Sequence, residues 1–502
     1  MIRRVLVANR GEIAVRVIRA CQELGLESVA VYSDADRRSR HVTLADHAEF
    51  IGPAPPLESY LSVSHIVDAA RRSGADAIHP GYGFLSENED LAAACEASGL
   101  VFVGPPAAVI ARMGSKIDAR QRMAAAGVPV VPGESPVDQS DEGVAEAVRR
   151  VGYPALVKAS AGGGGKGMRR VESAADLSGS IQGARREALS AFGDGTLYVE
   201  RLIAAPRHVE VQIIADAHGS VVHLYERECS IQRRHQKVIE ETPSPVLTAE
   251  LRARITDAAV RAARAAEYRN AGTIEFLVEP PGADGRMLFY FLEMNTRLQV
   301  EHPITEAVVG IDLVQAQLRV AAGEPLPWTQ TSLAQRGHSV EARIYAESPA
   351  RGFLPQAGPL LLYRAPHRPG VRIDSGVAEG DEISVHYDPL IAKVVAAAET
   401  RHGAIARLAA ALRDFPILGI ETNLPFVLAV LGHERFLRGE VDTAFLDSSA
   451  DALVAASLAQ EPPAAVIAAF HAHAASPSAS DHRSPSRWDP WATPATRSFT
   501  PR

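Results

Sequence analysis

The sequence predicts a mixed α/β protein, α+β overall, that opens with a doubly wound parallel sheet. Short apolar strands alternate with amphipathic helices over about the first 105 residues, which is the pattern of parallel α/β units. Longer strands and helices follow at 207–330, and a further strand-rich region occupies about 338–446. The chain of 502 residues, 46% hydrophobic and 22% charged, is long enough for about three domains.

Residues 4–34 have the pattern of a strand, a helix and a second strand. The run RVLVAN is a short buried strand, and the segment GEIAVRVIRACQELG places Ile13, Val17, Cys21 and Leu24 on one helical face. The run ESVAVYSD predicts the second strand. The turn between the first strand and the helix is NRGE, which lacks the G-x-G-x-x-G of dinucleotide-binding folds. This argues against a Rossmann-type dehydrogenase.

A small lobe of short strands at 131–200 contains four consecutive glycines, Gly162 to Gly165. Each glycine costs about 0.5–1 kcal/mol relative to alanine in an ordered element, so the run predicts neither helix nor strand. The P-loop motif fails because Gly167 stands where Ser or Thr must follow the lysine. We predict a flap whose backbone N–H groups close over a triphosphate and exclude water, with a solvated linker as the alternative. Lys158 stands at the end of the predicted strand YPALVKAS, so we expect its side chain to point in one fixed direction.

A hairpin is predicted where the runs TIEFLVE and MLFYFLE flank the turn-forming segment PPGADGR. A turn centred near Asp284 places Glu275 opposite Glu293. Facing carboxylates repel unless a cation lies between them, and with Asn295 they form an all-oxygen set suited to Mg²⁺. The odd-numbered positions from 293 to 301 are all polar and would line one side of an extended chain. A half-buried strand with a wet outer face is the alternative for this run.

A third polar cluster lies in ERECSIQRRHQKVIEE, residues 226–241. Arg233, Arg234, His235 and Lys237 stand within five positions of one another beside acidic residues. This composition predicts a pocket for anions, and an exposed charged loop is the alternative.

Composition excludes several classes of protein. The formal net charge is −8, the isoelectric point is about 6.1, and no basic stripe is present, so nucleic acid is not an expected partner. Three widely separated cysteines form neither a zinc motif nor a disulfide framework, which favours a reducing cytoplasm. We find no signal-peptide core and no apolar run long enough to span a membrane. The Ser/Pro-rich end beyond about residue 450 predicts disorder or a linker, although it contains Trp488 and Trp491.

Taken in order, these segments resemble biotin carboxylase, a member of the ATP-grasp enzymes, over residues 1–446. The motifs that carry the resemblance are ANRGEIA (8–14), HPGYGFLSEN (79–88), MGSK (113–116), KASAGGGGKGM (158–168), PRHVEVQ (206–212), ECSIQRRHQKVIEE (228–241) and EMNTRLQVEHPITE (293–306). Ala161 departs from the family where its glycine run often starts, and Arg201 stands where a lysine is common.

The resemblance implies four regions along the chain. These are an N-terminal biotin carboxylase domain (1–112), an ATP-grasp domain (113–330) with a mobile lid lobe at about 131–203, a mixed α/β C-terminal domain (331–446), and an Ala/Ser/Pro-rich tail or linker (447–502).

The resemblance also implies a role for each matching site residue. The ATP site would comprise Lys116, Lys158, Gly164, Gly165, Glu200, Arg201, Leu202, Ile203, His208, Gln232, His235, Glu275 and Glu293. Mg²⁺ or Mn²⁺ would bind Glu275, Glu293 and Asn295, and bicarbonate would bind Lys237, Arg297, Gln299 and the main chain of Val300. Among the catalytic residues Arg297, Glu301, Arg343 and Lys237, Glu301 would be the base that deprotonates bicarbonate, and Arg343 would stabilise the enolate form of biotin.

The implied reaction is the ATP-dependent carboxylation of biotin through carboxyphosphate, the first half-reaction of an acetyl-CoA or propionyl-CoA carboxylase. No lysine of this sequence stands in the Met-Lys-Met setting of a biotinylated carrier, so we expect the carrier and the carboxyltransferase as separate partners. A homodimer or a hetero-oligomer is compatible with this expectation. Two alternatives stay open, namely another ATP-grasp ligase and a biotin carboxylase component that serves a non-acyl-CoA acceptor such as pyruvate. A nucleotide-binding module without turnover would not need Glu301, Arg297 and Arg343 together.

Overall fold

The computed structural model describes residues 2–160, 167–459, 461–462 and 464–474. The N-terminal region is a five-stranded sheet of strand order β3-β2-β1-β4-β5, and each neighbouring pair is parallel. Its strands are β1 (Arg4–Val7), β2 (Glu27–Ser33), β3 (His47–Gly52), β4 (Ala77–His79) and β5 (Val101–Phe102). The helices of this region are α1 (Gly11–Glu23), α2 (Arg40–Leu44), α3 (Val63–Ser73), α4 (Glu89–Ala97) and α5 (Ala107–Gly114). The strand–helix–strand pattern predicted for residues 4–34 is therefore present, because apolar side chains of α1 pack on the sheet.

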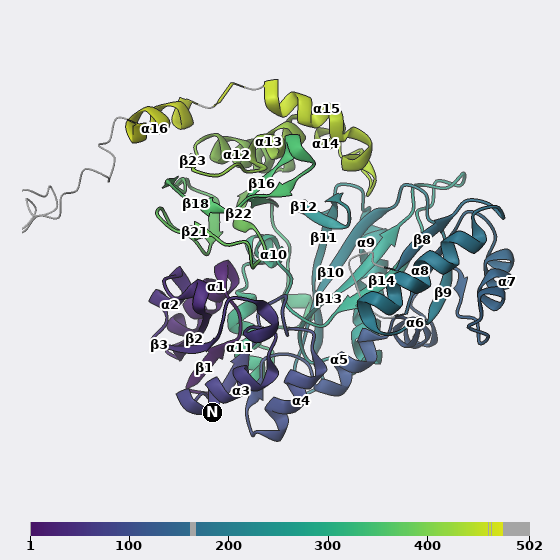
Figure 1. The fold of residues 1–502 in the computed structure, drawn as a ribbon. Coiled ribbons are helices and arrows are strands. Elements are labelled where there is room, and N and C mark those ends of the chain that lie inside the picture. Colours follow the sequence, from purple (N-terminus) through teal and green to yellow (C-terminus); the bar gives the residue numbers. More distant parts are fainter. Residues whose placement is uncertain (1, 161–166, 460, 463, 475–502) are drawn as a thin grey trace, which may run out of the picture.

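One eight-stranded antiparallel sheet runs through the middle of the molecule and into its C-terminal part (Figure 1), in the order β14-β13-β10-β11-β12-β15-β22-β20. Its strands are β10 (Arg207–Ala215), β11 (Val221–Arg233), β12 (Gln236–Thr242), β13 (Asn270–Val278), β14 (Phe289–Asn295), β15 (His338–Tyr345), β20 (Val371–Ser375) and β22 (Leu390–Ala398). Hydrogen bonding between β12 and β15 joins the central and C-terminal regions. Side chains from one region can therefore meet side chains from the other on a single sheet face.

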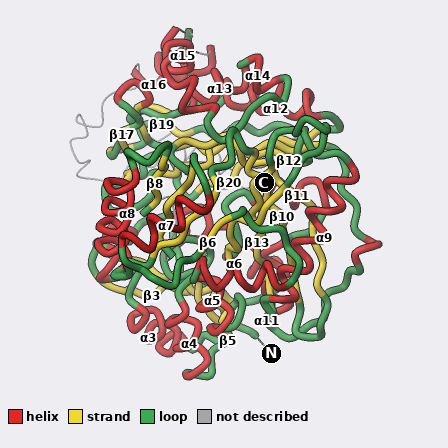
Figure 2. The backbone as a smooth tube through the Cα atoms, turned by 90° about the vertical axis from the view of Figure 1, so that its right-hand side faces the viewer, coloured by secondary structure: helices red, strands yellow, loops and turns green. Residues whose placement is uncertain are grey.

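The lobe that contains the glycine run is a separate four-stranded sheet, in the order β6-β9-β7-β8, with two helices on it (Figure 2). Its elements are β6 (Gly133–Glu134), α7 (Asp141–Val151), β7 (Ala155–Ala159), β8 (Met168–Val171), α8 (Leu177–Phe192) and β9 (Leu197–Arg201). Apolar residues such as Val144, Val157 and Ile181 form a small core of its own. The short chain segment after β9 leads directly into β10, which places the lobe beside the central sheet.

Helices pack against the large sheet. They are α6 (Lys116–Ala125), α9 (Ala249–Ala265), α10 (His302–Val309), α11 (Leu313–Ala321), α12 (Arg401–Arg413), α13 (Leu424–Gly432) and α15 (Phe445–Ala459). Helix α14 (Glu434–Leu437) packs on α13, and α16 (Ala464–Ala474) lies away from the sheet (Figure 1). Two-residue strands complete the C-terminal region at β16 (Glu347–Ser348), β17 (Leu354–Pro355), β18 (Gly358–Pro359), β19 (Leu362–Tyr363), β21 (Glu382–Ile383) and β23 (Ile417–Leu418). Helix α15 runs across residue 447, where the sequence interpretation begins a tail, and Leu453 of this helix is buried in the C-terminal core.

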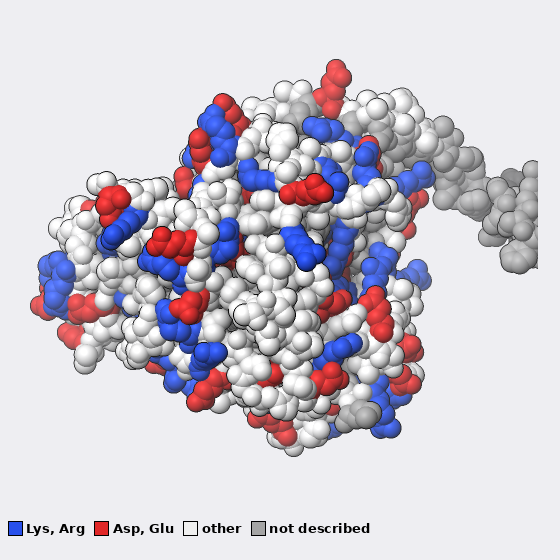
Figure 3. Space-filling view, turned by 180° about the vertical axis from the view of Figure 1, so that it is seen from behind, with Lys and Arg blue, Asp and Glu red and all other residues white. Residues whose placement is uncertain are grey.

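The surface bears charges of both signs. On the face shown in Figure 3, Lys and Arg side chains are interspersed with Asp and Glu side chains, and no broad patch of one sign is visible. Cys21, Cys95 and Cys229 are buried and free. Within the described ranges, no helix combines the length and hydropathy needed to cross a lipid bilayer.

Candidate active site

A cavity of about 600 Å³ lies between the glycine-rich lobe, the central sheet and the start of α15. The sequence-predicted residues that line it are Lys116, Lys158, Glu200, Arg201, Leu202, Ile203, His208, Gln232, His235, Lys237, Glu275, Glu293, Asn295, Arg297, Gln299, Val300 and Arg343. Glu301 is not itself part of this lining, but its carboxylate accepts hydrogen bonds from two lining residues, Lys237 and Arg343. Gly164 and Gly165 lie outside the described residues. The fold thus brings together residues that are far apart in the sequence.

Lys237 is the cationic centre of the cavity. Its Nζ lies 2.5 Å from Glu210, 3.0 Å from Glu275 and 2.7 Å from Glu301. Burial alone would lower the pKa of Lys237, but these three carboxylates outweigh it and hold the pKa well above its usual range. Lys237 is therefore a permanent positive charge beside the cavity.

Glu301 is fully buried and held by two cations. Lys237 donates to one of its oxygens over 2.7 Å, and Arg343 donates to the other over 2.9 Å. Burial by itself would raise the pKa of Glu301, but Lys237 and Arg343 lower it well below the usual range. The carboxylate is consequently ionised and able to accept a proton, although so low a pKa makes it a weak base in the empty cavity.

Glu275 and Glu293 face each other on neighbouring strands, as the hairpin pattern predicted. Burial would raise the pKa of Glu275, but Lys237 and His208 lower it far below the usual range. For Glu293, burial and the neighbouring Glu275 both raise the pKa. Two facing carboxylates beside an open cavity suit a divalent cation, because its charge would offset both the burial and the repulsion.

Three hydrogen-bonded polar side chains, Asn295, Arg297 and Gln299, come from the end of β14 and the loop that follows it. Arg297 donates to Gln299 Oε1 over 2.9 Å and to Asn295 Oδ1 over 3.2 Å. Asn295 and Gln299 in turn donate to Glu275 Oε1, over 3.0 and 3.2 Å. These bonds leave Arg297 and Gln299 at the cavity wall with donor groups that an oxyanion could share.

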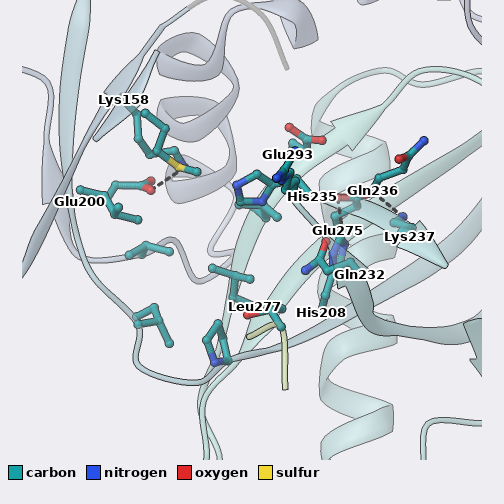
Figure 4. Close-up of a pocket in the computed structure, with 18 of the residues that line it drawn as sticks. Lys158, Glu200, His208, Gln232, His235, Gln236, Lys237, Glu275, Leu277 and Glu293 are labelled. Atoms are coloured by element: carbon teal, nitrogen blue, oxygen red, sulfur yellow. Dashed lines mark hydrogen bonds and ion pairs between the residues drawn. The ribbon is translucent and has the colours of Figure 1, made fainter. Parts of the chain in front are cut away.

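The glycine-rich lobe presents a second charged set across the cavity, as Figure 4 shows for Lys158 and Glu200. Lys158 Nζ donates to Glu200 over 2.9 Å, and Arg120 donates to the other oxygen of Glu200 over 2.8 Å. Burial would lower the pKa of Lys158, but Glu200 and Tyr198 raise it above the usual range. The apolar residues Leu202, Ile203 and Leu277 lie nearby in the cavity wall. A cation next to an apolar slot suits a nucleotide, with phosphates near the cation and a base in the slot.

The turn between β11 and β12 places His235 and Arg234 in the cavity wall. Arg234 has a φ of 48° and His235 a φ of 66°. Two consecutive positive φ values without glycine are uncommon, and such strain is often found at functional sites. Arg233 departs from the predicted anion pocket, because its guanidinium pairs with Glu347 at 3.0 Å and lies 3.7 Å from the ring centre of Phe353.

Sequence reasoning missed four acidic or basic residues that orient the site. Glu210 and Arg227, both fully buried, pair with each other, and Glu210 also holds Lys237. Glu240 accepts from Arg343 over 2.6 Å, and Glu87 accepts from Arg297 over 2.9 Å. Glu210 lies in the alternating run RHVEVQ, which is equally typical of a strand with one face in water. Nothing in that pattern distinguishes a polar face in water from one buried over a site.

The extended run predicted from 293 to 301 was wrong in its second half. Strand β14 ends at Asn295, and Glu301 directly precedes the first residue of α10. The intervening loop still directs Arg297 and Gln299 toward the cavity. Pro303 lies in the first turn of α10, where proline is favoured because no backbone donor is needed there.

Comparison with protein families divides the chain into three matched segments. Residues 1–110 match the biotin carboxylase N-terminal domain, and residues 341–448 match the biotin carboxylase C-terminal domain. Residues 115–329 match the ATP-binding domain of the carbamoyl-phosphate synthase L chain. The central scaffold is thus one that other ATP-grasp ligases share, while both flanking segments are those of biotin carboxylases.

Individual relatives agree with the family models. The chain is 51% identical to the biotin carboxylase of Halalkalibacterium halodurans over 446 residues, which is 89% of this chain and 97% of that protein. It is 52% identical to the mitochondrial methylcrotonoyl-CoA carboxylase subunit alpha of Oryza sativa subsp. japonica over 457 residues, or 91% of this chain. That match covers 62% of the subunit, so the chain spans about three-fifths of its length.

A solved structure also matches closely. It is the biotin carboxylase domain dimer of Hydrogenobacter thermophilus 2-oxoglutarate carboxylase, in complex with MgADP, ADP and bicarbonate. The TM-score is 0.86 at 43% sequence identity, over 90% of this chain and 99% of that one. The fold class and the family predicted from the sequence are thereby confirmed, and the chain belongs to the biotin carboxylase family of ATP-grasp ligases.

Proposed function

We propose that this chain uses ATP and bicarbonate to carboxylate biotin carried by a separate protein or domain. Membership of the family fixes the class of reaction, an ATP-dependent ligation that joins a carboxyl group to biotin. The observation that carries the residue-level proposal is Glu301, which is held between Lys237 and Arg343 next to the facing pair Glu275 and Glu293.

ATP would bind between the glycine-rich lobe and the central sheet. Lys116 and Lys158 would face the phosphates, and the segment from Glu200 to Ile203 would lie against the adenine. Glu275, Glu293 and Asn295 would hold Mg²⁺ or Mn²⁺, whose charge would offset that of the phosphate oxygens. His208, Gln232 and His235 line the same wall and complete the proposed nucleotide site.

Bicarbonate would bind to Lys237, Arg297, Gln299 and the main chain of Val300. Glu301 would accept its proton, and the freed oxygen would attack the γ-phosphorus of ATP. A new O–P bond would form as the bond to the ADP oxygen breaks, which gives carboxyphosphate and ADP. Lys237 and Arg297 would lower the pKa of bound bicarbonate, which would favour transfer of its proton to Glu301.

Carboxyphosphate would then break into CO₂ and phosphate beside biotin. The phosphate would take the proton from the ureido nitrogen, and that nitrogen would form the new bond to carbon. Arg343 would stabilise the negative charge on the ureido oxygen. Exclusion of water during these steps protects the intermediate from hydrolysis.

The final carboxyl acceptor depends on partners outside this chain. The relatives named methylcrotonoyl-CoA carboxylase subunit alpha support an acyl-CoA carboxylase, with a biotin carrier and a carboxyltransferase as partners. The 2-oxoglutarate and pyruvate carboxylases among the solved structures support a 2-oxo acid as the second candidate. We propose a cytoplasmic location because the three cysteines are free and buried, and a homodimer by analogy with the Hydrogenobacter domain.

The test is ADP release by the purified full chain, measured with bicarbonate and free biotin added separately and together. We expect ADP release to require bicarbonate and to rise with biotin. A biotinylated carrier should raise the rate further, because tethering increases the effective concentration of biotin. ADP release that is equal with and without bicarbonate would contradict the proposal, and carboxylation of another amine substrate in place of biotin would favour a different ligase.

A further inference from the structure

Lys393 is a buried lysine of the C-terminal sheet that the proposed mechanism does not use. It lies on β22, and its side chain has no exposed surface. Its Nζ donates to the main-chain oxygen of Val300 over 2.9 Å and lies 3.0 Å from Glu12 Oε1. Val300 lines the cavity, and the peptide that Lys393 contacts joins Val300 to Glu301. Lys393 therefore contacts the backbone of the active-site segment although it does not itself line the cavity.

Strand register explains how Lys393 reaches this peptide. Lys393 lies directly opposite Arg343 of β15 on one side and Asp374 of β20 on the other. Directly opposed residues of antiparallel strands point to the same face. Arg343 donates to the carboxylate of Glu301, and Lys393 donates to the carbonyl that precedes it. Two cations on one face of the sheet therefore hold Glu301. Arg343 contacts its side chain, and Lys393 contacts the peptide bond that precedes it.

The charge on Lys393 is balanced from the N-terminal domain. Glu12 stands in the first turn of α1 and also accepts a hydrogen bond from Tyr82. Burial would lower the pKa of Lys393, but Glu12 and Asp374 raise it, so the amine stays protonated. A buried cation without such partners would lose its charge or destabilise the fold.

Close backbone packing fixes Glu12 against the C-terminal region. A Cβ at Gly376 would lie 2.3 Å from the carbonyl carbon of Gly11, which directly precedes Glu12. The start of α1 therefore rests on the loop that follows β20 without space for a side chain between them. Glu12 and Lys393 are consequently held in place by two different regions of the chain.

We propose that Lys393 is a positioning residue that orients the Val300–Glu301 peptide, and so aims the Glu301 carboxylate at bicarbonate. The inference rests on the proposed function of Glu301. A misplacement of about 1 Å can cost about a hundredfold in rate, so the loss of one peptide contact can be large although Lys393 touches no substrate.

The test uses three variants of the full chain, assayed by ADP release as a function of bicarbonate concentration. Lys393→Met keeps a similar length and removes the donor. The double variant Lys393→Met with Glu12→Gln also removes the uncompensated carboxylate and preserves the test if the single variant folds poorly. Arg401→Met is the matched control, since it removes another cation of the C-terminal region, paired with Glu241 at 2.6 Å.

We expect kcat/KM for bicarbonate to fall about ten- to a hundredfold in both Lys393 variants. The Kd for ADP should stay within about threefold of wild type, because Lys393 contacts none of the proposed nucleotide residues. Arg401→Met should leave both quantities unchanged. Unchanged bicarbonate kinetics in either folded Lys393 variant, or an equal loss of ADP affinity, would overturn the inference. Absence of bicarbonate-dependent ADP release in the wild type would instead reject the proposed function.

Discussion

Arg343 donates to Glu301 over 2.9 Å and to Glu240 over 2.6 Å. The residue proposed to stabilise the biotin enolate therefore also holds the proposed base. Burial would lower the pKa of Arg343, but Glu240 and Glu301 are among the groups that hold it well above its usual range. Arg343 thus links the bicarbonate part of the site to the biotin part.

This contact predicts a double effect of Arg343→Met. We expect ADP release that depends on bicarbonate but not on biotin to fall about ten- to a hundredfold, together with biotin carboxylation, because Glu301 loses one of the two donors that orient its carboxylate. Arg343→Lys is the control that keeps the charge and should retain more of both activities. Normal ADP release with impaired biotin carboxylation would show that Arg343 acts on biotin alone.

Glu275 and Glu293 should differ in their effects on stability. Glu275→Gln removes a carboxylate that Lys237 and His208 contact, so we expect the free energy of unfolding to fall by on the order of 3 kcal/mol. Glu293→Gln removes a like charge opposite Glu275, so the metal-free protein should be as stable as wild type or more stable. The measurement is denaturant unfolding without added metal.

Both variants should nevertheless lose most Mg²⁺-dependent ADP release, because each removes a proposed metal ligand. Equal ADP release by wild type and either variant would reject that ligand. Equal destabilisation by the two variants would contradict the proposed difference between the two carboxylates.

The pair of His208 and Glu275 predicts a dependence of stability on pH. Their side chains lie 2.9 Å apart, and although burial lowers the pKa of His208, Glu275 raises it above its usual value. A raised pKa in the folded state contributes stability that is complete below the unfolded value of about 6.5. That contribution is lost as the pH rises through the folded pKa.

We therefore expect wild type to exceed His208→Gln in stability by more at pH 6 than at pH 9. The measurement is the difference in free energy of unfolding between the two proteins at each pH. Using the difference removes the contributions of other buried histidines, such as His79 and His302, whose pKa values burial lowers. A difference that is constant or grows toward high pH would contradict the assignment.

Local patterns in the sequence were sufficient for those parts of the fold in which neighbouring residues determine the geometry. The turn-forming segment predicted that β13 and β14 pair as a hairpin, and Glu275 does face Glu293, but a register shift between Glu275 and Phe276 contributes to that pairing and has no signal in the sequence. The apolar spacing of residues 13–24 likewise predicted α1. Both features depend on hydrogen bonds between residues close in the chain.

Other parts of the site depend on contacts that no local pattern encodes. The turn at Arg234 and His235 adopts positive φ values without glycine or asparagine, so turn chemistry gave no signal for it. Lys393 lies in an ordinary apolar strand, LIAKVVAAA, and its partner Val300 is 93 residues away. Such contacts arise only when the N-terminal, central and C-terminal regions pack together.

The most direct test of the account is the Glu301→Gln variant in the bicarbonate-dependent ADP-release assay. The amide oxygen can still accept a hydrogen bond from Lys237 or Arg343, but the amide group is not a base for bicarbonate. We expect the variant to bind ADP like wild type and to lose bicarbonate-dependent turnover by about 10²- to 10⁴-fold, the usual contribution of a positioned general base. Turnover within a few-fold of wild type, with intact nucleotide binding, would show that another group deprotonates bicarbonate.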